Sequence, residues 1–214
     1  MPTSPGYDAD RLGGRLPLLD TAALGAEQRQ VYEALTRMVV PEAAVSGFTA
    51  RLDDGRFVGP FNALLRVPKI AAGLGQWTAQ IARSGMADDV RQVVILTVGA
   101  AWSADYEIDA HTSAARVVGV PEEAINAIVA GTTPHTLNDE AAVACEFTVS
   151  LLTGRGMPEH LYRRAIAAFG EAGVIAILCL IGQYQTISSI LVCFQVPVPD
   201  RLENHERPGA GSQE

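Results

Sequence analysis

Residues 91–119 read RQVVILTVGAAWSADYEIDAHTSAARVVG, which contains two apolar helical runs separated by a short polar break. The break covers residues 102–105, and the second run carries Glu107 and His111, four residues apart. Side chains at positions i and i+4 lie above one another on one face of a helix, so this carboxylate and this imidazole can touch. The stretch therefore predicts a helical hairpin that presents a candidate acid–base pair.

Small side chains border this pair, because Ala110, Ala114 and Ala115 stand on the same helical run. They leave room for a ligand beside Glu107 and His111. Spacing alone slightly favours an ordinary pair on a helix surface, since residues four apart are neighbours on any helix. The interpretation as a catalytic pair therefore needs support from elsewhere in the chain.

Apolar residues recur with helical periodicity on both sides of the hairpin, and the alternation typical of a β-strand does not persist. Pro41, Pro60 and Pro68 mark expected helix ends and starts. We expect helices at about residues 20–38, 60–67, 70–84, 88–102, 105–118, 121–131, 138–154, 158–169 and 172–196. The sequence thus predicts an all-α domain.

The terminal segments differ in composition from the rest. Residues 1–14 are polar and rich in Gly and Pro, and residues 200–214 are charged. Such segments bury too little apolar surface to fold, so we expect both to be disordered tails. Residues 15–199 then form a single helical domain, which is an ordinary domain size.

Charge and cysteine content limit the function classes. The formal net charge is −8 and no basic stripe is visible, which argues against a nucleic-acid partner. Cys145, Cys179 and Cys193 are widely spaced and form no CxxC pair, as is typical of reduced thiols. No signal peptide is recognisable, and no HxxxH or HExxH spacing joins His111 to a second metal ligand. We therefore expect a cytoplasmic protein without a metal site.

Residues 172–199 contain no charged side chain and are numerous enough to cross a membrane. The centre of this stretch, however, holds polar residues such as Gln183, Tyr184 and Ser188, which lipid would penalise. We therefore predict a buried core helix and no membrane partner. So much apolar surface also predicts that several copies associate into a homo-oligomer.

Four segments occur in a characteristic order: FVGPFNALLRVP (57–68), RQVVILTVGAAWSADYEIDAH (91–111), GVPEEAINAI (119–128) and LIGQY (180–184). Together they resemble the carboxymuconolactone decarboxylase family, which is related to alkyl hydroperoxidase D, over roughly residues 15–199. The resemblance implies a helical bundle of the alkyl hydroperoxidase D-like type, with the site on its central hairpin. It also implies trimers or hexamers and, for the decarboxylase branch, a reaction without metal or organic cofactor.

Two departures separate the chain from the peroxidase branch of that family. The CxxC motif of this branch would fall at Ala104 and Glu107, and its upstream glutamate at Gln92. Disulfide cycling needs thiolates, so the sequence excludes a thiol peroxidase. His111 is kept, and the pattern resembles the non-redox members.

The resemblance implies roles for residues on and around the hairpin. His111 would donate a proton, and Glu107 would orient it or act as a base. A core histidine and a helix-terminal carboxylate are the structural alternatives. Candidate substrate-binding residues are Trp102, Tyr106 and Tyr184 as pocket walls, Gln92 as an orienting amide, Arg91 as a carboxylate clamp and Asn62 as a polar contact. Each of them also has an ordinary role in a core, a cap or a solvated surface.

We therefore expect a cofactor-independent decarboxylase or related lyase that binds a small-molecule substrate, a cyclic or unsaturated carboxylic acid such as a lactone or polyketide-like ring. A cofactor-free isomerase, dehydratase or cyclase would use the same groups. A helical oligomer that binds a small ligand or a protein partner without catalysis is the alternative from another class.

Overall fold

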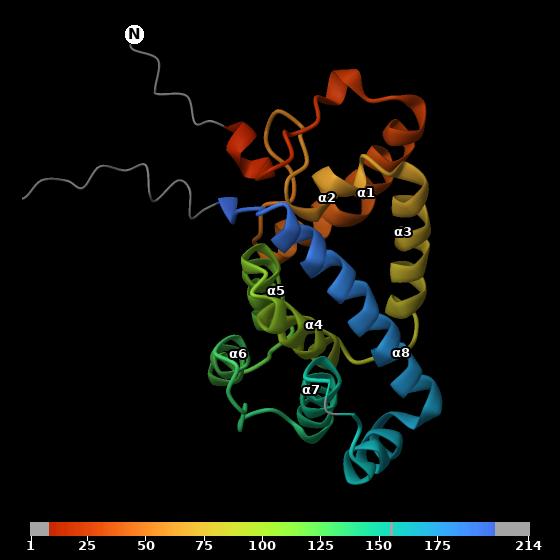
Figure 1. Cartoon of the computed structure of the whole chain (residues 1–214), viewed down its shortest axis with the longest axis vertical. Helices are drawn as coiled ribbons and strands as arrows, with labels where there is room; N and C mark the ends of the chain where they lie inside the picture. Colours follow the sequence, from red (N-terminus) through yellow and green to blue (C-terminus); the bar gives the residue numbers. More distant parts are fainter. Residues whose placement is uncertain (1–8, 155, 200–214) are drawn as a thin grey trace, which may run out of the picture.

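The computed structural model describes residues 9–154 and 156–199, in which eight α-helices, two short 3-10 helices and no strand occur (Figure 1). The prediction of an all-α fold is confirmed. The α-helices are α1 (Ala26–Ser46), α2 (Gly59–Leu64), α3 (Pro68–Ala82), α4 (Asp88–Trp102), α5 (Asp105–Val117), α6 (Glu122–Val129), α7 (Asp139–Leu152) and α8 (Glu159–Cys193). The 3-10 helices are η1 (Ala9–Gly13) and η2 (Thr21–Ala23).

Helix α4 is the centre of the packing and contacts α5, α6, α7 and α8 (Figure 1). Val93, Val94 and Leu96 have no solvent exposure, as expected for a helix that is apolar on all sides. Asp88 and Asp89 form its acidic first turn, where the helix dipole favours negative charge. Helix α4 therefore fixes the position of α5, which carries the candidate acid–base pair.

The turn between α4 and α5 lies at the predicted polar break, residues 102–105. Ser103 ends α4 with left-handed backbone angles, at a φ of 53°. Ala104 is the N-cap of α5, so Asp105 lies in the first turn and not at the cap position that an aspartate favours. The predicted hairpin is present, with its cap at Ala104.

Helices α1, α2 and α3 form a second group, which packs against α5 and α8. Gly59 and Pro60 open α2 as predicted, and Gly59 has a φ of 63°. A Cβ atom at Gly59 would lie 2.4 Å from the Tyr106 ring, so only glycine fits here. The Tyr106 hydroxyl donates to the Thr49 carbonyl oxygen at 2.6 Å. Tyr106 thus connects α5 to the loop between α1 and α2.

Helix α8 is interrupted at Gly170, whose φ of 64° and ψ of 176° are not helical. The sequence predicts a helix end at this residue. Beyond it, Ile177 and Leu180 are buried on one face, whereas Ile175 and Leu178 are exposed on the other. The prediction of a buried core helix is therefore right for one face only.

The exposed face of α8 bears on two predictions, that this helix does not cross a membrane and that copies of the chain associate. By length and composition α8 is apolar enough to cross a membrane, although core helices of soluble proteins meet the same criteria. Within the single chain, 28% of its most apolar window is buried. Association of copies through the exposed face would remove it from water, and this homo-oligomer stays a prediction.

The first helix is longer than the sequence predicts. Helix α1 continues through Pro41 to Ser46, where we expected Pro41 to end it. Ala43 is buried beyond the proline. Tertiary packing of the last turn therefore outweighs the hydrogen bond that Pro41 cannot donate.

The expected N-terminal tail is also partly wrong. Residues 9–13 form η1, and Leu12 is buried in a cluster with Leu18, Val58 and Leu191. The buried Leu12 and the hydrogen bond from the Arg15 backbone to the Phe194 carbonyl oxygen hold this stretch against the domain. The remaining tail residues, 1–8 and 200–214, lie outside the described part of the chain.

Candidate active site

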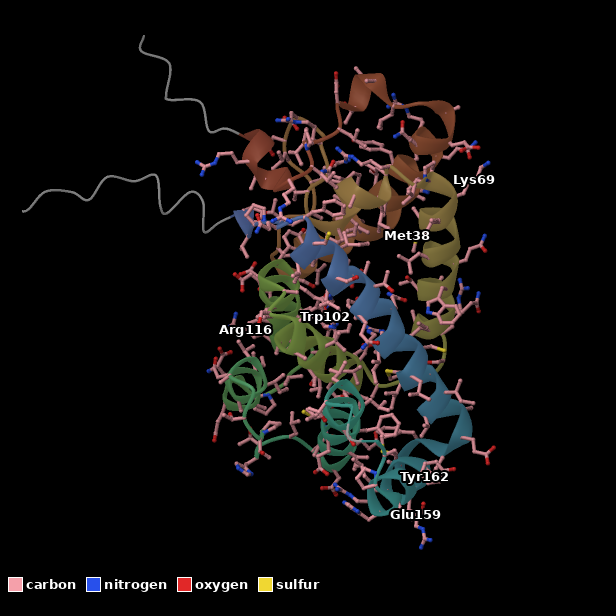
Figure 2. All side chains as sticks on the ribbon, viewed as in Figure 1. Met38, Lys69, Trp102, Arg116, Glu159 and Tyr162 are labelled. Atoms are coloured by element: carbon pink, nitrogen blue, oxygen red, sulfur yellow. The ribbon has the colours of Figure 1, made fainter. Side chains whose placement is uncertain are left out.

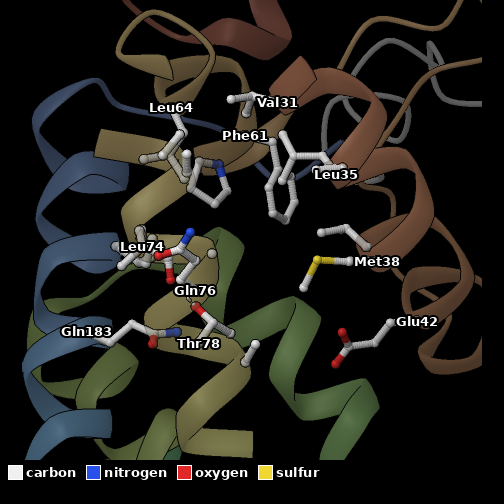
Figure 3. A pocket seen from close by; sticks show the side chains of 18 of the residues that line it. Val31, Leu35, Met38, Glu42, Phe61, Leu64, Leu74, Gln76, Thr78 and Gln183 are labelled. Atoms are coloured by element: carbon white, nitrogen blue, oxygen red, sulfur yellow. Dashed lines mark hydrogen bonds between the residues drawn. The ribbon is translucent and has the colours of Figure 1, made fainter. Parts of the chain in front are cut away.

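A cavity of about 610 Å³ lies between α1, α2 and α3 on one side and α5 and α8 on the other (Figure 3). The first side is mostly apolar, with Val31, Leu35, Phe61, Leu64 and Leu74 among its lining residues. Helix α5 contributes Glu107 and His111, and α8 contributes Gln183 and Tyr184. A largely apolar wall with a few convergent polar groups is typical of a small-molecule site.

Glu107 is buried in the wall of this cavity, with a relative exposure of 2%. Its Oε1 atom accepts a hydrogen bond from the Ser188 hydroxyl at 2.9 Å, and its Oε2 atom has no hydrogen-bond partner among the described residues. Burial raises the pKa of Glu107 from 4.5 to about 8, although the Ser188 hydrogen bond opposes this shift. Glu107 is therefore a neutral carboxylic acid at pH 7 and can donate a proton.

His111 is half-buried and is held by a residue of the neighbouring helix. Its Nδ1 atom lies 2.8 Å from the Oε1 atom of Gln92 on α4. An amide oxygen only accepts, so Nδ1 carries the hydrogen and Nε2 keeps a free lone pair. The Tyr184 ring contacts the imidazole edge-to-face, at 5.1 Å between ring centroids.

Burial lowers the pKa of His111 from 6.5 to about 3, and the nearby positive charge of Arg91 acts in the same direction. The imidazole is therefore neutral at pH 7 and is a base rather than an acid. The expectation that His111 donates the proton requires the charged imidazolium, which this environment disfavours; the role itself stays a prediction. The reason is burial, which disfavours the charged form of each group.

Glu107 and His111 stand one helical turn apart, as predicted, but each has a partner on a different helix. Ser188 on α8 holds the carboxyl group, and Gln92 on α4 holds the imidazole. The expectation that Glu107 orients His111 is therefore not met. Gln92 has this orienting role instead.

The other sequence-predicted residues divide into two sets. Tyr106 and Tyr184 line the cavity, as expected for pocket walls. Trp102, at the end of α4, is 37% exposed and is not among the lining residues (Figure 2). Burial raises the pKa of both tyrosines above its ordinary value, so both hydroxyls stay protonated.

Arg91 and Asn62 also lie outside the cavity lining. The guanidinium of Arg91 forms an ion pair with Asp88 at 2.7 Å, one turn away on α4. The Asn62 side chain accepts a hydrogen bond from the Leu19 backbone at 3.1 Å and donates to the Leu16 carbonyl oxygen at 3.3 Å. Asn62 therefore anchors the N-terminal segment, and the predicted roles of Arg91 and Asn62 in substrate binding are not supported.

Ser188 and Gln183 are site residues that the sequence did not identify. The sequence contains a signal for them, because both are polar residues at the centre of the uncharged, mostly apolar stretch in α8. Gln183 is buried, and its Oε1 atom has no hydrogen-bond partner among the described residues. The sequence could not show that this polar centre faces Glu107, because the residues Glu107 and Ser188 are separated by 81 positions.

Within residues 9–154 and 156–199, no group of three or more His, Cys, Asp or Glu side chains could hold a metal ion. The three cysteines are free thiols at different depths, and burial raises the pKa of Cys145.

The shifted pKa values predict how stability depends on pH. Between pH 4.5 and 8 native Glu107 holds a proton that the unfolded chain has released, so stability falls as pH rises. Between pH 3 and 6.5 the unfolded chain holds a proton on His111 that the native state lacks, so stability rises with pH. The two effects oppose each other between pH 4.5 and 6.5.

We expect the free energy of unfolding to be highest in that interval and to fall by about 1.4 kcal/mol per pH unit from pH 6.5 to 8. Urea denaturation at half-unit pH steps, followed by circular dichroism, measures this dependence. The matched control is Glu107→Gln, which should remove the decline above pH 6.5. A wild-type stability that stays constant from pH 6.5 to 8 would contradict a protonated Glu107.

The fold and the site together define a class of protein: an all-helical domain of the alkyl hydroperoxidase D-like type, with an acid and a neutral imidazole on its central hairpin. The family model of the carboxymuconolactone decarboxylase family matches residues 68–149 of the chain. The resemblance predicted from the sequence is confirmed over this stretch. No curated protein and no solved structure matches the chain.

The matched stretch contains only part of the cavity. It includes α3, α4 and α5, and therefore Gln92, Glu107 and His111. Helices α1, α2 and α8 lie outside it and supply Val31, Phe61, Gln183 and other lining residues, together with Ser188, which holds Glu107. The family match therefore covers the acid–base pair and the α3 wall of the cavity, but not the walls that α1, α2 and α8 contribute.

Proposed function

We propose that the protein is an enzyme that transfers protons to and from a small, largely apolar substrate in the cavity. Glu107 is the proton donor, and the free Nε2 atom of His111 is the acceptor. The observation that carries this proposal is a carboxylic acid buried in the cavity wall with one oxygen unpaired, one helical turn from a neutral imidazole. Acids and bases with oppositely shifted pKa values are characteristic of catalytic sites.

The family name indicates decarboxylation as one reaction of this kind. When a cyclic or unsaturated carboxylate loses carbon dioxide, the electron pair of the broken carbon–carbon bond stays on the substrate as an enolate-type carbanion. Glu107 protonates that carbon and becomes a carboxylate, which regains a proton from water. Neutral donors close to the enolate oxygen would stabilise the charge as it develops.

Isomerisation, dehydration and ring closure need the same groups in a different order. The Nε2 atom of His111 removes a proton from the carbon next to a carbonyl group, while Glu107 donates a hydrogen bond to the carbonyl oxygen. Glu107 then delivers its proton at another position, and the proton on Nε2 passes through solvent to the Glu107 carboxylate, which restores both groups. Cofactor-free proton transfer is thus the common step of all these reactions.

The pH dependence of the reaction tests this assignment. Carbon dioxide release from a panel of cyclic and unsaturated acids, and deuterium uptake from D₂O into a panel of ketones and lactones, detect turnover. We expect kcat/KM to fall above about pH 8 as Glu107 ionises, and to fall on the acid side only near pH 3. A loss of activity centred near pH 6.5 would instead assign the proton to an ordinary histidine and contradict the proposal.

The alternative is a non-catalytic protein that binds a small ligand or a protein partner. The solvent exposure of Ile175 and Leu178 on α8 is the observation in favour of a protein partner. Such a protein would bind ligands but would release no carbon dioxide and exchange no deuterium. The same two assays therefore separate the classes.

A further inference from the structure

Charged groups are few around the cavity, and negative ones predominate. Apart from Glu107, the charged lining residues are Glu27, Glu42 and Lys69. The ammonium of Lys69 lies 3.6 Å from the Glu27 carboxylate, and both side chains are largely exposed. Lys69 lies at the outer edge of the molecule (Figure 2). Among the described lining residues there is thus no buried cation that could pair with a bound anion.

Arg91, the expected carboxylate clamp, and Arg66, another arginine, are both engaged elsewhere. Arg91 pairs with Asp88, and Arg66 donates hydrogen bonds to Asn62 and to the Pro17 carbonyl oxygen. Neither arginine lines the cavity. A carboxylate that entered would therefore lose its hydration without gaining a cationic partner, which is strongly unfavourable.

The remaining wall suits an uncharged molecule. Figure 3 shows Leu64, Phe61 and Leu35 around one end of the cavity, with Glu42 beside Met38 on the α1 side. On the α5 and α8 side, neutral Glu107 is a hydrogen-bond donor and Gln183 offers an amide. A carbonyl oxygen can accept from the Glu107 hydroxyl, and the Gln183 amide donates only through its nitrogen, so such a ligand needs no charge.

We propose that the cavity binds an uncharged apolar carbonyl compound, such as a ketone, an ester or a lactone, in preference to the corresponding carboxylate. This inference rests on the proposed function, because it takes the cavity as the substrate site. It narrows that function to proton transfer next to a neutral carbonyl group, with isomerisation or ring closure favoured over decarboxylation of an anion. The formal net charge of −8 adds long-range repulsion against anions.

Three probes of nearly the same shape test the inference: 2-acetylnaphthalene, 2-naphthoate and 2-naphthylmethylammonium. Isothermal titration calorimetry on the full chain at pH 7 gives their dissociation constants. We expect the ketone to bind at least about tenfold more tightly than either ion, because only the ions must lose a charged hydration shell. Naphthoate that binds as tightly as the ketone, or an ammonium that binds more tightly, would overturn the inference.

Two charge-reversal variants on α1 test whether charge at the cavity causes the preference for the ketone over naphthoate. Glu42→Lys should strengthen naphthoate binding about three- to tenfold and change ketone binding little, because it replaces a negative charge at the cavity by a positive one. Glu33→Lys is the matched control, since Glu33 is exposed on the same helix but does not line the cavity. Equal gains from both variants would show that overall charge, and not the cavity, sets the selectivity, and would count against the inference.

Two further variants separate the possible failures. Met38→Trp should weaken ketone binding, because Met38 is 51% exposed and lines the cavity, so a larger side chain fills it without disturbing the core. Unchanged ketone binding in this variant would place the probe elsewhere and overturn the inference. Glu107→Gln should keep the preference for the ketone, because the amide retains a donor of the same shape. If Glu107→Gln no longer binds the ketone more tightly than naphthoate, the inference of a neutral carbonyl ligand is refuted. If Glu107→Gln turns over substrate at the normal rate, the proposed function is refuted instead.

Discussion

Replacement of Glu107 by glutamine is expected to lower kcat by about 10²–10⁴-fold, the range for loss of a general acid. Glutamine keeps the size of the side chain and can still accept the hydrogen bond from Ser188. It cannot donate a proton to carbon. The loss should therefore appear in kcat more than in KM, because substrate binding is preserved.

Stability provides the control for this variant. Glu107→Gln should be at least as stable as the wild type above pH 6.5, because the amide cannot ionise in the buried site. Circular dichroism and urea denaturation at pH 8 measure this. A folded Glu107→Gln protein with near-normal turnover would rule out Glu107 as the proton donor.

Ser188→Ala tests the Glu107 carboxyl group by removing its hydrogen-bond donor. The Ser188 hydroxyl holds down the pKa of Glu107, so its removal should move the alkaline limb of the pH–rate profile upward. Ser188 does not exchange protons with substrate in this scheme, and the plateau rate should change less than in Glu107→Gln. A purely structural serine would lower stability without moving that limb.

Local signals in the sequence were sufficient for much of the fold. Asn138 accepts a hydrogen bond from the Ala141 backbone and caps α7 at the start of the predicted helix, and Gly170 interrupts α8 where a helix end was expected. Such signals act over one or two turns, so a single sequence contains them. Pro41 is the counterexample, because packing that is distant in sequence decides its outcome.

The site could be predicted only in part, for the same physical reason. The i, i+4 spacing placed Glu107 and His111 on one face of α5, since both residues belong to one helix. Their charge states depend on burial by α1, α3 and α8, which no local pattern reveals. Their partners, Gln92 and Ser188, come from α4 and α8. The proposed donor and acceptor roles therefore differ from those expected from the sequence, in which His111 donates the proton and Glu107 orients it or acts as a base.

Replacement of His111 by asparagine is the second change with a large expected effect. Asparagine can hydrogen-bond to Gln92 but has no lone pair basic enough to remove a proton from carbon, so kcat should fall by about 10²–10⁴-fold. The double variant with Glu107→Gln should be little worse than the worse single variant, because groups that act as a unit are not additive. Circular dichroism must show that the variants fold, because His111 also packs against Tyr184.

Gln92→Glu is the companion experiment, because it changes the proton affinity of His111 and leaves the imidazole in place. A carboxylate beside Nδ1–H stabilises the imidazolium, so the pKa of His111 should rise from about 3 toward its ordinary value. The acid limb of the pH–rate profile should then move up by about one unit or more, while KM changes little. This limb reports the base itself, whereas a histidine that only fills the core would lower stability and leave the limb in place. An unmoved acid limb in a folded Gln92→Glu protein, together with near-normal turnover by His111→Asn, would exclude His111 from the reaction.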